Sequence, residues 1–254
     1  MPALATPFAN AAAYYDQFRA PYAPAAIDFV AQTFGISRGV EVLDLGCGPG
    51  SLAIQWARRG AKVTAVDIDK AMLGEARRLA GDLPITFVEG RAEDVIPALG
   101  SFRMVSFGNA LHWMDRDGVL AALAPKVMGL AIFDEGARRP QESWERTAAE
   151  IVRRYLGDRP RHPGKHPEAR HQPCLDRSAH FADYQIKEFP TRVTRDAASV
   201  LGCVYSGIGV SKKLLGKDTD AFEADLKAAI LGIYPSGVFT ELIETAVFTA
   251  WTSG

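Results

Sequence analysis

The sequence predicts an α/β fold with a mostly parallel seven-stranded sheet and helices on both of its faces. Short apolar runs alternate along the chain with segments of helical periodicity. A glycine-rich turn, residues 46–50, follows the first apolar run. The chain has 254 residues, 48% of them hydrophobic, which is enough for one large core. Strands joined by helices run parallel and are covered on both faces, so we expect that architecture here.

Two helices precede the sheet. Apolar residues recur at helical spacing over residues 11–18 and again over residues 27–34. The second helix should end at Gly35, because glycine readily takes the left-handed conformation that closes a helix. We expect both helices to cap the sheet.

The strands are predicted from apolar runs, and the helices between them from apolar stripes of period 3.6. The predicted strands are residues 40–45, 63–67, 85–88, 102–107, 129–133, 184–193 and 245–251. The helical stripes cover residues 52–57, 72–79, 119–123, 144–155 and 222–230. Four prolines interrupt residues 157–180, which are therefore predicted to form a long loop or lid.

Composition excludes several classes of protein. A net charge of −1 and an isoelectric point near 6.5 provide no general attraction to nucleic acid or to an anionic membrane. Three cysteines without CxxC spacing suggest neither a disulfide framework nor zinc. His162, His166 and His171 suggest a metal site, but Pro163 and Pro167 prevent a helical metal-binding face and no carboxylate cluster completes the ligand shell, so no metal site is predicted. No targeting or membrane-spanning segment is apparent, so a soluble cytoplasmic protein is expected.

The glycine turn indicates which nucleotide-like ligand to expect. A dinucleotide fingerprint, Gly-x-Gly-x-x-Gly starting at Gly46, would require glycine where this chain has Ser51. An NAD(P)-dependent oxidoreductase is therefore the less favoured alternative. Asp67 ends the second apolar strand, within reach of a ribose.

The run from Asp44 through Gly46 and Gly48 to Gly50, together with Asp67, resembles the first motif of class I S-adenosylmethionine-dependent methyltransferases. Residues 67–73, 89–94 and 109–113 resemble the following blocks of the small-molecule branch, which includes trans-aconitate and ubiquinone-type enzymes. The resemblance covers residues 40–133 in family order. It implies a Rossmann-like fold and S-adenosyl-L-methionine as cofactor, with S-adenosyl-L-homocysteine as product. That cofactor carries an ammonium, a sulfonium and a ribose diol, so acidic groups suit it.

The resemblance also implies an organisation and a set of site residues. We expect a single methyltransferase domain over 1–254, with an N-terminal helical cap (1–36), a cofactor-binding core (37–136), a substrate and lid region with strand six (137–240) and a final strand (241–254). The expected cofactor-binding residues are Asp44, Gly46, Cys47, Gly48, Gly50, Asp67, Ile68, Met72, Ala92, Glu93, Asn109, Ala110, Tyr14 and Arg19. The expected walls of the acceptor pocket are Tyr15, Trp113, Trp144 and Tyr155.

Several of these residues have structural alternatives. Asp44 can instead bond a turn or helix N-terminus, and Asp67 can cap the next helix, although Asp69 is better placed for that. His112 is the candidate general base, because it follows strand four and titrates near neutral pH; alternatively it packs with Trp113. Tyr15 also fits an ordinary amphipathic helix, with Arg19 exposed.

The predicted activity is SN2 transfer of a methyl group to an oxygen, nitrogen or carbon nucleophile of a small molecule, with the sulfonium as leaving group. Amino-methylating nucleic-acid enzymes of this fold carry an Asp/Asn-Pro-Pro-aromatic block that residues 108–111 lack, so no nucleic-acid partner is expected. The loop 153–180 has seven Lys/Arg and three acids and could attract an anionic substrate, or could simply be solvated. A cofactor-binding protein that no longer methylates, serving as a scaffold or catalysing a rearrangement, is the alternative. Monomer and homodimer both remain open.

Overall fold

The computed structural model describes residues 12–135, 144–158, 167–207 and 209–253. Contacts between Cα atoms divide the chain into two compact units. One, here called the sheet unit, comprises residues 21–136, 165–191 and 244–254, and the other, the helical unit, comprises residues 1–20, 137–164 and 192–243. Each is described by itself. The single domain and its division into four segments stay predictions.

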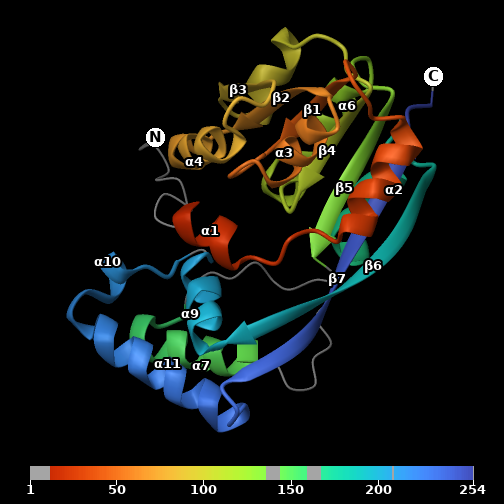
Figure 1. The fold of residues 1–254 in the computed structure, drawn as a ribbon. Coiled ribbons are helices and arrows are strands. Elements are labelled where there is room, and N and C mark those ends of the chain that lie inside the picture. The colour runs from red at the N-terminus through yellow and green to blue at the C-terminus, as the bar shows by residue number, and fades with distance from the viewer. Residues whose placement is uncertain (1–11, 136–143, 159–166, 208, 254) are drawn as a thin grey trace. The chain divides into compact units, whose positions relative to one another are not determined.

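A seven-stranded sheet confirms the predicted fold class (Figure 1). Its order is β3-β2-β1-β4-β5-β7-β6. The strands from β1 to β5 pair in parallel with their neighbours, and β7 pairs antiparallel with β5. The strands are β1 (Glu41–Leu45), β2 (Lys62–Asp67), β3 (Ile85–Glu89), β4 (Met104–Gly108), β5 (Gly129–Glu135), β6 (Tyr184–Asp196) and β7 (Val238–Trp251). The chain moves outward from β1 to β3 and then returns to add β4 beside β1, so the strand order reverses there. Parallel sheets bind ligands beyond the strand ends at such a point.

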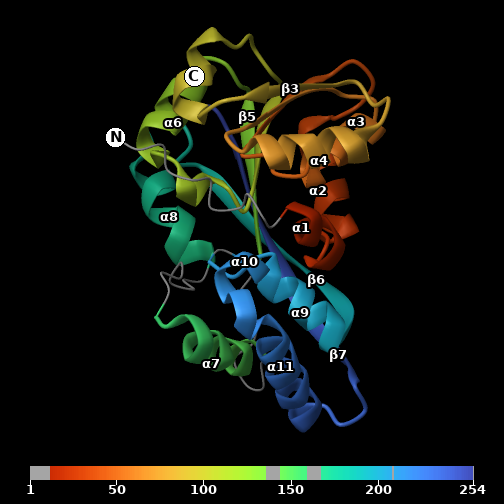
Figure 2. The same ribbon diagram turned by 90° about the vertical axis from the view of Figure 1, so that its left-hand side faces the viewer.

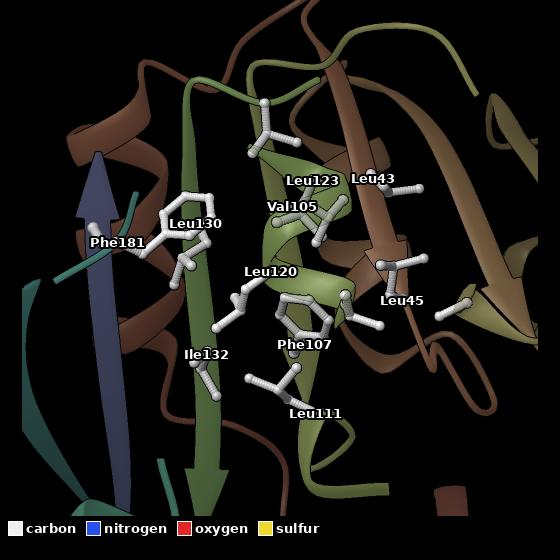
Figure 3. Packing of buried hydrophobic residues seen from close by; sticks show 14 of the residues in the cluster. Leu43, Leu45, Val105, Phe107, Leu111, Leu120, Leu123, Leu130, Ile132 and Phe181 are labelled. Carbon is white, nitrogen blue, oxygen red and sulfur yellow. The ribbon is translucent and has the colours of Figure 1, made fainter. Parts of the chain in front are cut away.

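Helices cover both faces of the sheet, as Figure 2 shows. The chain has α2 (Pro24–Phe34), α3 (Ser51–Arg58) and α4 (Lys70–Ala80) against one apolar face. Against the other face lie α5 (Ala92–Val95), α6 (Arg116–Leu123) and α8 (Pro167–Arg177), with the short 3₁₀ segments η1 (Ile96–Ala98) and η2 (Leu111–Trp113). Figure 3 shows the packing on this second face, where Phe107 and Ile132 lie among leucines of β1, β5 and α6. Two-residue alternation along each strand therefore decides which helices a side chain meets.

The second predicted N-terminal helix, α2, is confirmed and packs on the sheet. It starts with Pro24, whose missing N–H is not needed in a first turn, and ends at Gly35, which has φ of 64°. The first predicted helix is also present as α1 (Ala12–Phe18), but it belongs to the helical unit.

The helical unit has its own apolar core. Besides α1 it contains α7 (Trp144–Leu156), α9 (Ala197–Tyr205), α10 (Lys212–Leu215), the 3₁₀ segment η3 (Gly216–Asp218) and α11 (Thr219–Ile233), together with one end each of β6 and β7. The stripe predicted for α7 is confirmed, because Trp144, Ala148 and Ile151 are buried. No helix in the described parts of the chain is both long and apolar enough to cross a membrane.

The prediction of an uninterrupted loop over residues 157–180 is wrong, because α8 occupies Pro167–Arg177. Pro167 stands at the helix start, where proline is favoured, and Pro173 lies within the helix. The residues around Pro173 compensate for its lost hydrogen bond by burial, since His171, Cys174 and Leu175 have almost no exposed surface. His162 and His166 lie outside the described residues.

Two strand boundaries also differ from the predicted ones. β4 begins at Met104, and Phe102 instead forms an isolated bridge with Val127. β7 begins at Val238, seven residues before the predicted start. Its first five residues alternate between exposed and partly buried positions and include Glu241, so they lack the continuous apolar run by which the rest was recognised.

Candidate active site

The glycine turn after β1 is the centre of the candidate site. Gly46, Gly48 and Gly50 have φ of 66°, 55° and 88°, a left-handed conformation that other residues adopt at a cost. A Cβ atom on Gly46 would lie 2.5 Å from the Cβ of Ala110, whereas one on Gly48 would meet nothing within 4 Å. Gly46 is therefore packed against the segment after β4, and Gly48 faces open space that a ligand can enter.

Asp67, at the end of β2, fastens this turn. Its Oδ2 accepts a hydrogen bond from the amide of Gly48 at 2.8 Å, and its Oδ1 accepts one from the amide of Asp69 at 2.8 Å. Asp69, not Asp67, is the N-cap of α4, where it accepts from the amides of Ala71 and Met72. Burial raises the pKa of Asp67 above its usual value. The carboxylate thus stands beside the open face of the turn with unused lone pairs.

Asp44 lies inside the sheet unit beneath the same turn. It is 1% exposed; its Oδ1 accepts from Ser106 Oγ at 2.6 Å and its Oδ2 accepts from the amide of Ala53 at 3.1 Å. Ala53 is in the first turn of α3, so Asp44 makes the helix N-terminal hydrogen bond that its structural alternative required. Trp56 Nε1 donates to the same Ser106 hydroxyl at 3.1 Å. Burial raises the pKa of Asp44 to about 7.

The segment after β4 closes the other side of the turn. Asn109 has φ of 50° and is the only non-glycine residue with positive φ in the described part of the chain. Asparagine tolerates this conformation better than most residues. Its amide donates to the carbonyl of Phe133, and its Nδ2 donates to Tyr22 Oη at 3.1 Å. Ala110 is buried against Gly46.

A polar cluster follows at the ends of β4 and β5. Arg170 Nη1 lies 2.7 and 2.8 Å from the two carboxylate oxygens of Asp134, and His171 Nε2 lies 2.7 Å from Asp134 Oδ2. The His112 ring is 6.1 Å from the His171 ring and 5.2 Å from the ring of Trp113, centroid to centroid. Asp134 and His171 are buried, His112 is partly buried, and Trp113 is 47% exposed. The candidate base therefore has both the predicted contact with Trp113 and a polar neighbour.

Comparison with known proteins identifies the core. Residues 42–126 match the family model of a methyltransferase domain. This segment is thus similar to a methyltransferase domain. A ubiquinone biosynthesis O-methyltransferase of Alkalilimnicola ehrlichii is 47% identical over 62 residues, which are 24% of this chain and 25% of that protein. A malonyl-[acyl-carrier protein] O-methyltransferase of Enterobacter lignolyticus is 35% identical over 114 residues, 44% of each chain. The matches thus span less than half of either relative.

Similarity of fold extends over nearly the whole chain. The crystal structure of a putative methyltransferase from an antibiotic biosynthesis pathway of Anabaena variabilis superposes with a TM-score of 0.61, covering 91% of this chain and 98% of that one. Its sequence identity is 14%, so this similarity concerns the fold alone.

The residues of the methyltransferase domain suit the family's cofactor, S-adenosyl-L-methionine. The open space over Gly48 admits a nucleoside close to the backbone. Beside it, Asp67 offers acceptor oxygens, which a ribose diol needs and which a pyrophosphate would avoid. The place of the cofactor above the glycine turn stays a prediction.

The other predicted cofactor residues of the sheet unit lie around this turn with different exposures. Cys47 is buried, which raises the pKa of its thiol, and its amide donates to the carbonyl of Val66. Met72 and Ala92 are buried as well, whereas Ile68 is 52% exposed. Glu93 accepts from the amide of Asp115 at 3.0 Å. Their contacts with the cofactor stay predictions.

Three predicted site residues of the N-terminal segment belong to the helical unit. Tyr14 packs against the ring of Tyr205 with a centroid distance of 5.3 Å. Arg19 Nε donates to Ser206 Oγ at 3.1 Å, and the Arg19 guanidinium lies 5.2 Å from the centroid of the Tyr15 ring. Arg19 is partly buried, so the alternative in which it is exposed is wrong. A role of this segment over the cofactor stays a prediction.

The two predicted acceptor-pocket residues of α7 have polar partners within the same unit. Trp144 Nε1 donates to Glu241 Oε2 at 3.0 Å, and Tyr155 Oη donates to Asp225 Oδ2 at 2.8 Å. Trp144 is 5% exposed, so it contributes to the core of the helical unit. Its place in an acceptor pocket stays a prediction, as does that of Tyr155.

Sequence reasoning missed Ser106, Tyr22, Asp134 and Arg170. Ser106 stands opposite Asp44 in the register of β1 and β4, which a single strand does not reveal. Asp134 and Arg170 meet only because α8 packs on β5. The one signal available was Asp134 itself, a carboxylate at the end of an apolar run, as Asp67 is.

Replacement of Asp44 by Asn should change how stability depends on pH. Between its unfolded pKa of 3.8 and its folded pKa of about 7, Asp44 is protonated in the folded protein and ionised in the unfolded chain. Folding then takes up a proton, so the wild type should lose roughly 1.4 kcal/mol per pH unit in the middle of this window relative to Asp44→Asn. The difference should level off above pH 7. Urea unfolding of both proteins at several pH values between 4.5 and 8 measures it, and parallel stability profiles would contradict the expectation.

Proposed function

We propose that this protein transfers a methyl group from S-adenosyl-L-methionine to a small-molecule acceptor. The observation that carries the proposal is the open glycine turn beside Asp67, at the point where the strand order reverses. The matching relatives named as O-methyltransferases support it. Because those matches span less than half of each relative, the activity, the acceptor class and the partners are part of the proposal.

In this mechanism the side chains of the protein bind and orient the cofactor and the acceptor. Asp67 accepts hydrogen bonds from the ribose hydroxyls while its bond to Gly48 holds the turn in place. Asp44 and Ser106 hold the start of α3 under the turn. When bound, the cofactor supplies an electrophilic methyl group on a sulfonium that is already a good leaving group. Alignment of the acceptor and exclusion of water then provide most of the acceleration.

The acceptor is proposed to approach from the side of the segment after β4. His112 is partly buried there and is proposed to take the acceptor's proton as general base. The Trp113 side chain is 47% exposed. The net charge of −1 favours a small molecule over nucleic acid. A cytoplasmic protein, monomeric or homodimeric, fits the same proposal.

Incubation with labelled cofactor tests the function directly. Purified protein, S-adenosyl-L-methionine labelled in the methyl group and a metabolite extract should yield a labelled small molecule by mass spectrometry. Parallel reactions with total RNA and with an acceptor-free buffer serve as controls. Cofactor binding without any labelled product would favour the non-methylating alternative, and labelled RNA would overturn the acceptor class.

Asp67→Ala should weaken cofactor binding by about 2 kcal/mol, which is about thirtyfold in affinity. The substitution removes the charge-assisted hydrogen bonds to the ribose and the hydrogen bond that Asp67 accepts from the amide of Gly48. Titration calorimetry with S-adenosyl-L-homocysteine measures the affinity. Asp82→Ala, which removes an exposed carboxylate between α4 and β3, is the matched control and should bind like the wild type. Equal affinity of Asp67→Ala and the control would mean that the ribose lies elsewhere.

His112→Ala should separate acceptor chemistry from cofactor binding. Loss of a general base lowers turnover by about a hundredfold or more for a hydroxyl acceptor, while cofactor affinity should remain within twofold. Steady-state kinetics with the identified acceptor and calorimetry with the cofactor product measure the two effects. If both fall together, His112 belongs to the cofactor pocket instead.

A further inference from the structure

His112, Asp134 and His171 form the only group of three potential metal-ligating side chains found in the described part of the chain. They come from η2, the end of β5 and α8, respectively. Each offers one ligand atom, and these three atoms lie within 4.8 Å of one another. Three elements separated in sequence thus bring imidazole and carboxylate ligands to the edge of the sheet where the acceptor is proposed to bind.

We propose that these three side chains bind a divalent transition-metal ion of the zinc type. Two imidazole nitrogens and one carboxylate oxygen are a donor set that Zn²⁺ favours, with a fourth position left for a non-protein ligand. Bonds of about 2.0–2.2 Å in tetrahedral geometry separate donors by roughly 3.4 Å, so small side-chain rotations bring the three atoms into place. This goes beyond the sequence prediction of no metal site, which did not consider Asp134.

Arg170 is compatible with a bound ion. Its Nη1 contacts both oxygens of Asp134, at 2.7 and 2.8 Å. A carboxylate has about four lone-pair positions, so Oδ1 can keep Arg170 while Oδ2 turns to the ion. Such an outer hydrogen-bond partner orients a ligating carboxylate. Arg170 therefore acts as a support for Asp134.

His171 provides the second observation. Its ring is fully buried; Nε2 lies 2.7 Å from Asp134 Oδ2, and Nδ1 has no hydrogen-bond partner. A buried ring nitrogen without a partner is costly, and most such nitrogens in proteins are satisfied. Nε2, which already faces the carboxylate, is the nitrogen placed to bind an ion beside Asp134. The ring also packs edge-on against Phe248, which limits where it can turn.

Charge balance indicates what fills the fourth position. Arg170 neutralises Asp134, and ligating imidazoles are neutral, so the two positive charges of the ion remain uncompensated in a buried cluster. An anionic oxygen, from hydroxide or from a hydroxyl or carboxylate acceptor, balances part of that charge. This assignment of the acceptor rests on the proposed methyl transfer. An ion would lower the pKa of an acceptor hydroxyl bound to it. In that case His112 would act as a ligand of the ion and not as a general base.

Metal titration tests the site without any need for the acceptor. Tag-free full-length protein, stripped with a chelator and desalted, is titrated with Zn²⁺ by calorimetry and with Co²⁺ by visible absorbance. We expect one ion per chain, with an affinity at least tenfold lower in His171→Gln and in His112→Gln. His180→Gln, a change of an exposed histidine outside the cluster, should leave the affinity unchanged.

The outcomes separate this proposal from the proposed function. Absence of stoichiometric binding to the wild type, or equal affinity in the wild type and both cluster variants, would overturn the metal site. Calorimetry with S-adenosyl-L-homocysteine on the same samples reports on the fold and on the cofactor site independently. If His171→Gln does not fold, His112→Gln, at a partly exposed position, decides the question alone.

Discussion

Gly46→Ala should lower the free energy of unfolding by about 3 kcal/mol, because it combines left-handed strain with a steric overlap. The new Cβ would lie 2.5 Å from the Cβ of Ala110, and the φ of 66° is unfavourable for any side chain. Relief of the overlap requires displacement of Ala110 and of the neighbouring Asn109, which itself has positive φ. Urea denaturation followed by circular dichroism, without cofactor, measures the change.

Gly48→Ala is the matched control for this effect. Gly48 has a similar φ of 55°, but a Cβ there meets no atom within 4 Å. It should therefore cost only the conformational strain, about 1 kcal/mol. The difference between the two variants isolates the steric contribution of Ala110. Equal destabilisation of the two variants would mean that the glycine turn can shift away from the segment after β4 at no cost in free energy.

Asp134→Ala should destabilise the protein by about 3 kcal/mol or more, because it leaves the Arg170 guanidinium without its carboxylate. The Asp134 side chain is 1% exposed and that of Arg170 is 17% exposed, so water replaces the lost partner poorly. His171 loses its partner at the same time. Urea denaturation in a chelating buffer measures the change without any contribution from a bound ion.

A second pair between α8 and the rest of the sheet unit provides the control. Arg177 and Asp117 form an ion pair at 3.0 Å whose side chains are both 61% exposed. Asp117→Ala should cost less than about 1 kcal/mol, since exposed ion pairs contribute little. A similar loss in both variants would indicate that burial does not strengthen the Asp134 pair.

The cofactor half of the fold could be predicted from sequence because its determinants are local. β1 and β2 are mostly apolar and largely buried, and the turn between β1 and α3 is marked by glycines that the backbone requires. Asp67 and Asp69 could be assigned different tasks from their positions alone, and Asp69 is indeed the cap of α4.

The acceptor side depends on contacts between distant segments and could not be predicted in the same way. The prolines of residues 167–177 disfavour a helix locally, yet burial of His171 and Leu175 against the sheet stabilises α8. Because α8 was not foreseen, neither was the meeting of Asp134 with Arg170 and His171. Tertiary packing outweighed local propensity here.

The reversal of strand order between β1 and β4 has a consequence for how such a protein can diversify. The segment shared with the family model ends at residue 126, before β5, so Asp134, α8 and all of the helical unit except residues 1–20 lie downstream of it. The strands on the β1 side of the reversal can keep residues that bind the nucleoside, while the strands on the β4 side acquire residues for a different acceptor. Exchange of everything after α6 between such proteins is therefore a rational route to altered acceptor choice with the methyl donor unchanged.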